Sequence, residues 1–385
     1  MGTMSAESCK NLVASSLMAE CPPTAYTPPD SLTVQEAELR EWDTFLARTP
    51  GGSYQQTGAW AIAKLADGYR ARRFAIKRGE VTVGGAQMLI RKLPVYGAVA
   101  YVPLGPVLAS DDPEAATLAL RHLHRIAGER KVRCLVVQPP RGMEAFARNL
   151  QNEGFSRAFV ALAPNASVVI DLFNSLDAIL SKMRKATRHH IRASQRNGIV
   201  IREGQLEDID AFDKVLLATA KRQDFSKLEK DYLCEVWRQF SRGGHINMFL
   251  AEYEGQPVSA ILTMAFGDTV TYWRGGWSGE HGNRYPNEAV HWAAMQWAKS
   301  RGYRYYDFGG IPRGVAERVL AGEAVSNPAQ HSVAFYKLGF GGQIEVFPEA
   351  LIYIYNQTLR RLWSRLSQRE LEQTLLRKML RRVVN

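Results

Sequence analysis

Four arginines recur at every fourth position in the segment LSKMRKATRHHIRASQR, residues 180–196. This spacing places them along one face of a helix: Arg184, Arg188, Arg192 and Arg196. The segment contains no acid, and like charges four residues apart destabilise a helix by about 0.2–0.5 kcal/mol per pair. An uncompensated arginine row therefore indicates a bound anion such as phosphate, with Arg188 and Arg192 as candidate ligands. A solvated helix face is the alternative.

No protein nucleophile is evident elsewhere in the chain. There is no G-x-S-x-G elbow. His189 and His190 have no carboxylate or cysteine partner at zinc-site spacing, so we expect packing or phosphate contacts from them. We expect neither a metal nor a cofactor. The four cysteines are scattered, which suits free thiols in a cytoplasmic protein: Cys9, Cys21, Cys134 and Cys234.

The composition is that of a globular protein with a basic surplus. The 385 residues include 49 Lys and Arg against 38 Asp and Glu, and 46% of them are hydrophobic. These values exclude a mainly disordered chain. The net charge of +11 is consistent with a polyanionic partner, and solubility alone is the alternative explanation. The chain has no run of about 18 uncharged apolar residues, so we predict no membrane span.

The elements that must position these residues follow the same order twice. Residues 1–30 are Pro-rich and predict a disordered tail, and a helix is expected to open near Ser31. Hairpin turns at Arg78-Gly-Glu and Glu254-Gly-Gln are each followed by a strand, a helix, a strand and a helix that ends at Gly-Phe. We infer duplicated domains over 31–165 and 166–350.

This order of elements resembles an acyl-CoA N-acyltransferase (GNAT) domain, whose mixed sheet is splayed in the middle. We therefore predict an α/β (α+β) fold of tandem duplicated GNAT-type domains. CoA-using members have an R/Q-x-x-G-x-G/A turn that binds pyrophosphate at a helix N-terminus. The segments 151–156 and 195–200 are only near matches and do not open a helix. A donor other than CoA is favoured.

The C-terminal region, 351–385, predicts a basic amphipathic helix. Between Leu359 and Arg382 it has eight Lys and Arg against Glu370 and Glu372. Such a helix binds an anionic membrane or an RNA backbone. A packing helix with a solvated outer face is the alternative.

Five segments, in this order over about residues 40–350, resemble the FemABX family. They are Tyr54-Gln55 with Trp60 and Lys64, Tyr101-Val-Pro-Leu-Gly-Pro-Val, Met183-Arg-Lys-Ala-Thr-Arg-His-His-Ile-Arg, Tyr306-Asp-Phe-Gly-Gly-Ile and Phe335-Tyr-Lys-Leu-Gly-Phe-Gly-Gly. Family members have two acyltransferase-like domains and transfer an amino acid from aminoacyl-tRNA to an amine of a peptidoglycan precursor. The resemblance implies aminoacyl-tRNA and a UDP- or lipid-linked muramyl peptide as partners of a monomer, at the inner face of the cell membrane.

The resemblance also assigns roles to individual residues. It implies that Lys64 contacts the phosphate of the precursor, that Tyr232 contacts the substrate, and that Lys337 and Tyr336 lie at the reaction centre. Departures from the family pattern leave the acceptor open. Leu228 stands where relatives often have an arginine, and no coiled-coil arm is inserted in the second domain.

An aminoacyl ester is already activated, so the reaction needs a neutral amine and a stabilised oxyanion. Under the resemblance, Lys337 supplies the positive charge and Tyr336 packs the donor; a surface lysine that completes a helix end is the alternative for Lys337. Asp307 either accepts a proton or caps the glycine turn that follows it, and the cap is favoured. The alternatives for the whole chain are transfer to a small peptide natural product, a CoA-dependent N-acyltransferase, and an RNA-binding protein with degenerate domains.

Overall fold

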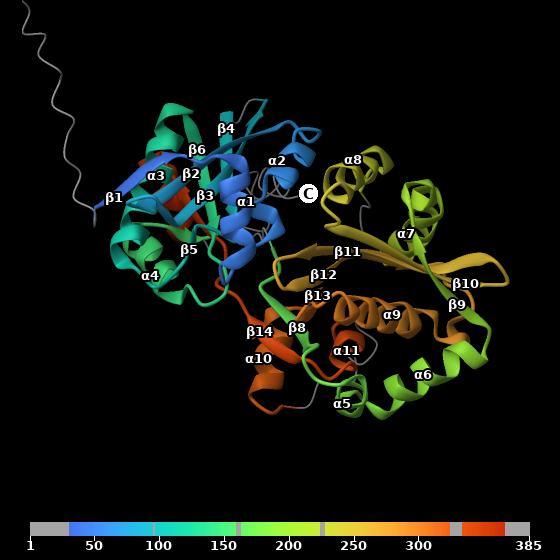
Figure 1. Ribbon diagram of the computed structural model, residues 1–385. Coiled ribbons are helices and arrows are strands. Elements are labelled where there is room, and N and C mark those ends of the chain that lie inside the picture. The colour runs from blue at the N-terminus through green and yellow to red at the C-terminus, as the bar shows by residue number, and fades with distance from the viewer. Residues whose placement is uncertain (1–30, 95–96, 159–162, 224–227, 324–332, 366–385) are drawn as a thin grey trace, which may run out of the picture.

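The computed structural model describes residues 31–94, 97–158, 163–223, 228–323 and 333–365. They form two mixed β-sheets, each packed with helices, that lie side by side (Figure 1). The predicted disordered tail, residues 1–30, lies outside the described residues.

The first domain is built on a sheet with the strand order β1-β2-β3-β4-β6-β15-β7, and β5 pairs with β3. Helices α3 and α4 pack against this sheet, whereas α2 lies toward the second domain. The elements are β1 (Leu32–Glu36), α1 (Leu39–Arg48), α2 (Gly58–Ala63), β2 (Tyr69–Arg78), β3 (Val81–Leu93), β4 (Gly97–Pro103), β5 (Val107–Leu108), α3 (Pro113–Glu129), β6 (Val132–Gln138), α4 (Glu144–Asn152), β7 (Ser156–Arg157) and β15 (Leu351–Ile354).

The second domain has the strand order β14-β8-β13-β12-β11-β10-β9. Helix α9 covers one face of this sheet, and α7 and α8 cover the other (Figure 1). The elements are β8 (Ala166–Asp171), α5 (Leu176–Lys182), α6 (Lys185–Arg196), β9 (Ile199–Gly204), α7 (Ile209–Gln223), α8 (Lys230–Ser241), β10 (Ile246–Tyr253), β11 (Gln256–Phe266), β12 (Thr269–Trp277), α9 (Pro286–Ser300), β13 (Tyr305–Gly310), α10 (Arg313–Leu320), α11 (Val333–Leu338) and β14 (Gln343–Val346), followed by α12 (Gln357–Arg365).

The predicted repeat is present: β2, β3, β4, α3 and β6 of the first domain correspond to β10, β11, β12, α9 and β13 of the second. The third and fourth strands of each set run parallel. In the first domain β4 and β6 stay paired from Ala98 to Pro103. In the second domain β12 and β13 pair only from Thr269 to Thr271 and then separate. The second sheet is therefore splayed, as the GNAT prediction requires, whereas the first is closed at the equivalent place.

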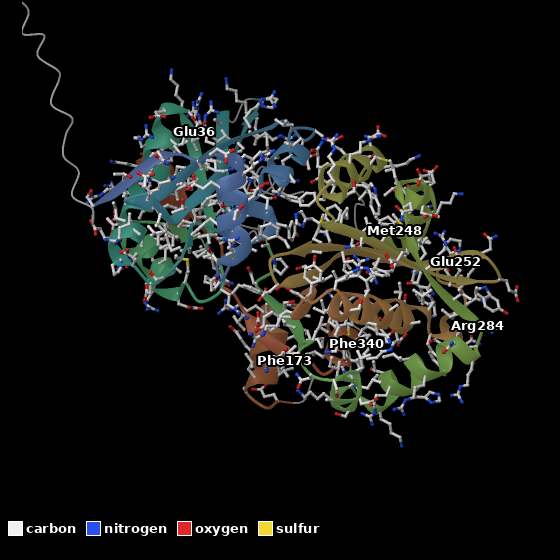
Figure 2. All side chains as sticks on the ribbon, in the orientation of Figure 1. Glu36, Phe173, Met248, Glu252, Arg284 and Phe340 are labelled. Atoms are coloured by element: carbon white, nitrogen blue, oxygen red, sulfur yellow. The ribbon has the colours of Figure 1, made fainter. Side chains whose placement is uncertain are left out.

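The second core fills the space beneath the splayed sheet. Phe340 lies there beside α9 and α11 (Figure 2), and it is 1% exposed. Helix α9 begins with Pro286, which has a backbone angle suited to the first helical turn and needs no amide partner there. Arg284, just before the helix, donates to the carbonyl of Asn197 at 2.7 Å and joins the loop to the end of α6. These contacts fix the start of α9 at the edge of the gap.

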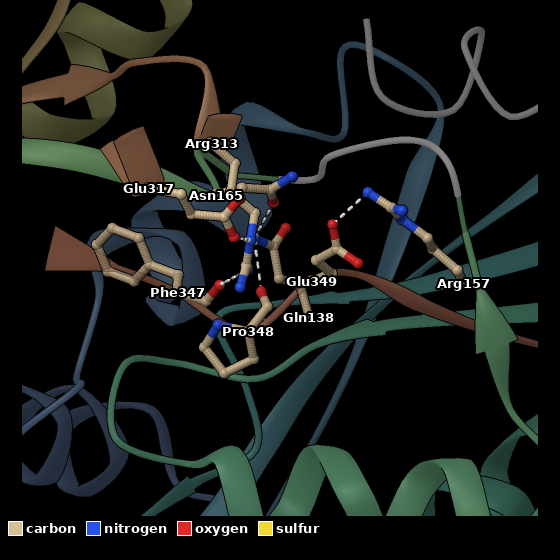
Figure 3. A network of polar contacts seen from close by, with 8 residues as sticks. All are labelled: Gln138, Arg157, Asn165, Arg313, Glu317, Phe347, Pro348 and Glu349. Atoms are coloured by element: carbon tan, nitrogen blue, oxygen red, sulfur yellow. Dashed lines mark hydrogen bonds and ion pairs between the residues drawn. The ribbon is translucent and has the colours of Figure 1, made fainter. Parts of the chain in front are cut away.

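Two chain crossings join the domains, and the buried Gln138 holds both (Figure 3). Its side-chain oxygen accepts from the amide of Ala163 at 2.8 Å, and its amide nitrogen donates to Asn165 Oδ1 at 3.2 Å and to the carbonyl of Pro348 at 3.5 Å. A buried amide with this many partners stabilises both crossings at once. Arg157 forms an ion pair with Glu349 on the adjacent, more exposed side.

Three local predictions were wrong. The segment after Ser31 forms strand β1 rather than a helix, because Leu32 and Val34 alternate into the core on β2. The arginine segment is not one helix: Met183 and Arg184 are extended between α5 and α6, since the amide of Arg184 donates to the carbonyl of Gly339 at 2.8 Å. The C-terminal region begins with a strand, Leu351–Ile354, between β6 and β7. A basic helix, α12, follows, and the rest of that prediction lies outside the described residues.

Candidate active site

A cleft of about 1620 Å³ lies between the two domains. Residues of both β12 and β13 line the cleft, so the gap between these two strands opens into the cleft. Four of the six predicted site residues line this cleft: Lys64 from the first domain and Tyr232, Tyr336 and Lys337 from the second.

Lys337 is a buried cation at the splayed part of the sheet. It lies on α11, is 6% exposed, and donates from Nζ to the carbonyl of Gly310 at 2.8 Å. The same nitrogen is 5.4 Å from the centre of the Tyr272 ring. Burial lowers the pKa of Lys337 to about 8, and the charge of Asp307 opposes that change. Lys337 is therefore not a surface lysine, and it is mostly protonated at neutral pH.

Asp307 caps the glycine turn and also faces the cleft. Its carboxylate accepts from the amide of Gly309 at 2.7 Å and from the hydroxyl of Ser167. The predicted cap is confirmed. Burial raises the pKa of Asp307, while the Ser167 hydroxyl, the Gly309 amide and the charge of Lys337 oppose that rise. A carboxylate whose pKa is raised, beside a lysine whose pKa is lowered, is a typical arrangement for proton transfer.

Tyr336 adds a hydroxyl group to the candidate site that contains Lys337 and Asp307. The hydroxyl is buried and has no hydrogen-bond partner among the described residues, although the ring packs 5.4 Å from Phe340. His291 lies alongside, with Nδ1 2.8 Å from the hydroxyl of Tyr306. Burial lowers the pKa of His291 to about 3, so this histidine is neutral. It packs and orients its neighbours without adding charge.

Both domains contribute to the other end of the cleft. Lys64, just after α2, forms an ion pair with Asp67 at 2.7 Å. Its ammonium lies over three aromatic rings, 5.3 Å from Trp60, 5.9 Å from Tyr69 and 4.9 Å from Tyr232. Burial lowers the pKa of Lys64. The hydroxyl of Tyr232, on α8, is buried and has no partner within the described chain.

Arg188 and Arg192 lie away from this cleft. Arg188 donates to the carbonyls of Met183 and Ser181 and so completes the end of α5. Arg192 is exposed on α6, which packs against α9. Neither lines the cleft. The role of this row in binding phosphate stays a prediction, now for an outer face of the second domain.

His190 has packing contacts, as the sequence indicated. Its ring is stacked on Tyr285 at 3.9 Å, and its Nδ1 lies 2.9 Å from a carboxylate oxygen of Glu288.

The splay of the second sheet separates the edges of β12 and β13 at the cleft. Leu262 pairs with Arg274 and Thr263 with Tyr272, so Trp273 is an extra residue that forms a bulge in β12. Bulges of this kind redirect strand edges and are common next to active sites. Beyond Thr271, the edge of β12 that faces β13 is not paired with it.

Sequence reasoning missed three residues of the site. Ser167, which donates to Asp307, and His291 come from segments with no motif. Arg274 lines the cleft from β12, and its sequence signal was a lone arginine in the aromatic stretch Thr271–Trp277. Only the tertiary fold brings these side chains to one place.

Comparisons with known proteins agree with this arrangement. A family model described as the FemAB family matches residues 37–158, and one described as an acetyltransferase (GNAT) domain matches residues 181–317. A lipid II:glycine glycyltransferase of Staphylococcus saprophyticus is 21% identical over 342 residues, which are 70% of this chain and 82% of that relative. One from Staphylococcus aureus (strain MRSA252) is 23% identical over 228 residues, or 56% of this chain, and the match spans about half of that relative, 54%.

The crystal structure of FemX has the same fold. Its TM-score is 0.75 at 18% sequence identity, and the match covers 86% of this chain and 100% of FemX. Two family models, one on each half of the chain, the named relatives and this structural match agree with one another. The chain is therefore similar to the FemABX family: the FemAB family model matches residues 37–158, and the fold is that of FemX.

Proposed function

We propose that this protein transfers an amino acid from aminoacyl-tRNA to an amine of a muramyl-peptide precursor and so builds the interpeptide bridge of peptidoglycan. The observation that supports this most is the position of Lys337. It is a buried, protonated side chain at the gap between β12 and β13, inside a cleft to which both domains contribute. The names of the relatives, lipid II:glycine glycyltransferases, supply the substrate class.

The reaction needs no protein nucleophile. The neutral amine of the acceptor attacks the carbonyl carbon of the aminoacyl ester, and a C–N bond forms while the carbonyl electrons move to oxygen. The ammonium of Lys337 stabilises that oxyanion. The nitrogen then gives its extra proton to Asp307, the C–O bond to the ribose breaks, and the ribose oxygen leaves with that proton. Tyr336 packs the donor side chain and offers its free hydroxyl.

The acceptor enters from the end of the cleft that holds Lys64 and Tyr232. That end contains a cation and a hydroxyl without a partner in the described chain, which suit a phosphorylated precursor. No helix of the described residues is long and apolar enough to cross a membrane. A lipid-linked precursor would bind at the inner face of the membrane. Basic residues of the second domain and of α12 would attract anionic lipid there, and they would also attract RNA.

The test is a transfer assay with the purified protein. Bulk tRNA charged with labelled amino acids is incubated with UDP-linked or lipid-linked muramyl pentapeptide, and the mass of the acceptor is followed. We expect the acceptor to gain one aminoacyl group, and we expect RNase treatment of the donor to prevent it. Transfer that survives RNase and requires acyl-CoA would overturn the proposal. Transfer to an unrelated small peptide, and not to the muramyl peptide, would show that the proposed acceptor is wrong.

A further inference from the structure

A second cation, Arg274, lies in the cleft near Lys64. It projects from β12, lines the cleft and is exposed to it. Its guanidinium is 5.2 Å from the ring centre of Trp273 and donates to the Trp273 carbonyl at 2.9 Å. A planar guanidinium held against an indole keeps its remaining N–H groups directed to the open side.

Lys64 and Arg274 are joined by an aromatic pair that crosses between the domains. The Lys64 ammonium lies over Trp60, and Trp60 meets Trp273 edge to face with ring centres 6.4 Å apart. Arg274 lies over the other indole of this pair. The positive charge of Arg274 contributes to the lowered pKa of Lys64, and it also acts on Tyr54 and Tyr232. The two cations therefore lie within electrostatic range of each other on either side of the Trp60–Trp273 contact.

No carboxylate of the described residues pairs with Arg274. Lys64 has Asp67 as its partner, but within the described chain Arg274 forms no ion pair. Two cations held near each other disfavour one another unless an anion lies between them. The buried hydroxyl of Tyr232, which lines the same cleft, also has no partner among the described residues. The site thus offers a free guanidinium, an ammonium and a hydroxyl donor.

We propose that Arg274 is a substrate-binding residue that, with Lys64, holds the diphosphate of the muramyl acceptor. This inference rests on the proposed function and adds a residue to it. Arg274 lies on β12, the same strand that contributes Tyr272 to the surroundings of Lys337, so a diphosphate bound there directs the peptide along the splayed strands toward the reaction centre. A planar, bidentate donor suits phosphate oxygens better than a lysine does.

The test compares two probes on the intact protein by calorimetry: UDP-linked muramyl pentapeptide and the same muramyl pentapeptide without the UDP group. Arg274→Ala is expected to weaken binding of the UDP-linked probe by about 10- to 100-fold, as for loss of a charged hydrogen bond. Binding of the probe without UDP should change little. Arg274→Lys should restore part of the loss. The control is Arg301→Ala, since Arg301 lies 5.6 Å from the ring of Trp297 in the same kind of stack but outside the cleft.

Equal losses for both probes, or a loss in Arg301→Ala as large as in Arg274→Ala, would overturn the role of Arg274. The role is also overturned if the wild-type protein binds the two probes equally well. Binding is measured without donor, so the result is independent of the transfer assay. A protein that binds the diphosphate through Arg274 but transfers nothing from charged tRNA would leave this inference in place and remove the proposed function.

Discussion

The ammonium of Lys64 lies 4.9 Å from the ring centre of Tyr232, and the two residues belong to different domains. The contact is completed by Trp60, which packs 6.3 Å from Phe240 of the second domain. One end of the cleft therefore exists only when the domains are in contact. In the proposed function, the first domain contributes to the acceptor surface and the second contains the gap where the reaction takes place.

Tyr232→Phe should separate binding from stability. The hydroxyl of Tyr232 is buried without a partner, so its removal should leave the free energy of unfolding unchanged or raise it by about 1 kcal/mol. Acceptor binding should weaken, because Tyr232 lines the cleft and its hydroxyl has no partner among the described residues. The measurements are urea unfolding and calorimetry with the UDP-linked pentapeptide.

Tyr306→Phe is the matched control for this substitution, because the Tyr306 hydroxyl already bonds His291 at 2.8 Å. That variant should lose stability. If Tyr232→Phe lost as much stability as Tyr306→Phe, the hydroxyl of Tyr232 would have a structural role instead.

The pH profile of transfer should report Lys337. Burial lowers its pKa to about 8 from 10.5, so the positive charge is present below that pH and is lost as the pH rises through it. The reactivity of the acceptor amine has the opposite pH dependence, since the amine must be neutral to attack. We expect a falling limb near pH 8 in the single-turnover rate, and Lys337→Arg should move that limb to higher pH. Identical profiles for the two proteins would show that the limb belongs to another group.

Asp307→Asn should lower the rate of aminoacyl transfer and move the falling limb of its pH profile. The asparagine oxygen can still accept from Gly309, so the turn should survive, but no carboxylate remains to take a proton. The rate of transfer should fall by a factor of about 10²–10⁴. Because the charge of Asp307 raises the pKa of Lys337, the falling limb should also move to lower pH. Ser167→Ala, which keeps the carboxylate but removes the hydroxyl that contacts it and the carbonyl of Gly309, serves as the milder comparison. If Asp307→Asn transferred at the wild-type rate, Asp307 would only cap the glycine turn and would take no part in proton transfer.

Gln138→Leu should destabilise the junction of the domains. It removes the partner of the buried amide of Ala163 and of the carbonyl of Pro348, and each unsatisfied group costs about 1–3 kcal/mol. Arg157→Ala removes a half-exposed ion pair in the same network and should cost about 0–1 kcal/mol. Thermal unfolding measures both. Equal melting temperatures for the two variants would mean that Gln138 does not hold the crossings.

The sequence was enough to predict the fold, and four of the six predicted site residues line one cleft. Turns, helix ends and period-two strands are local signals, and they revealed the repeat. Leu351–Ile354 was missed because it lies beside a basic helix, although the run Leu-Ile-Tyr-Ile-Tyr is typical of a buried strand. Its partners, β6 and β7, lie about 200 residues earlier in the chain, and no local pattern specifies such a pairing.

The site shows the same division between local and tertiary signals. Lys337 and Tyr336, which line the cleft, were singled out because they stand in a motif that resembles the family's. Arg274 and His291 were missed because their importance comes from a bulge in β12 and from the face of α9 that lines the cleft. The arginine row was recognised as a pattern, but Arg188 turned out to complete the end of α5. A helical spacing shows which side chains share a face, not what that face meets.

The most direct test of the account is the single-turnover rate of aminoacyl transfer in Lys337→Met, measured with charged tRNA and muramyl pentapeptide at pH 7. Methionine keeps the volume and removes the buried charge, so the variant should fold with an unchanged or higher melting temperature. The account predicts a rate at least about 100-fold below that of the wild type, with activity partly kept in Lys337→Arg. A folded Lys337→Met protein that transfers within about threefold of the wild-type rate would contradict it.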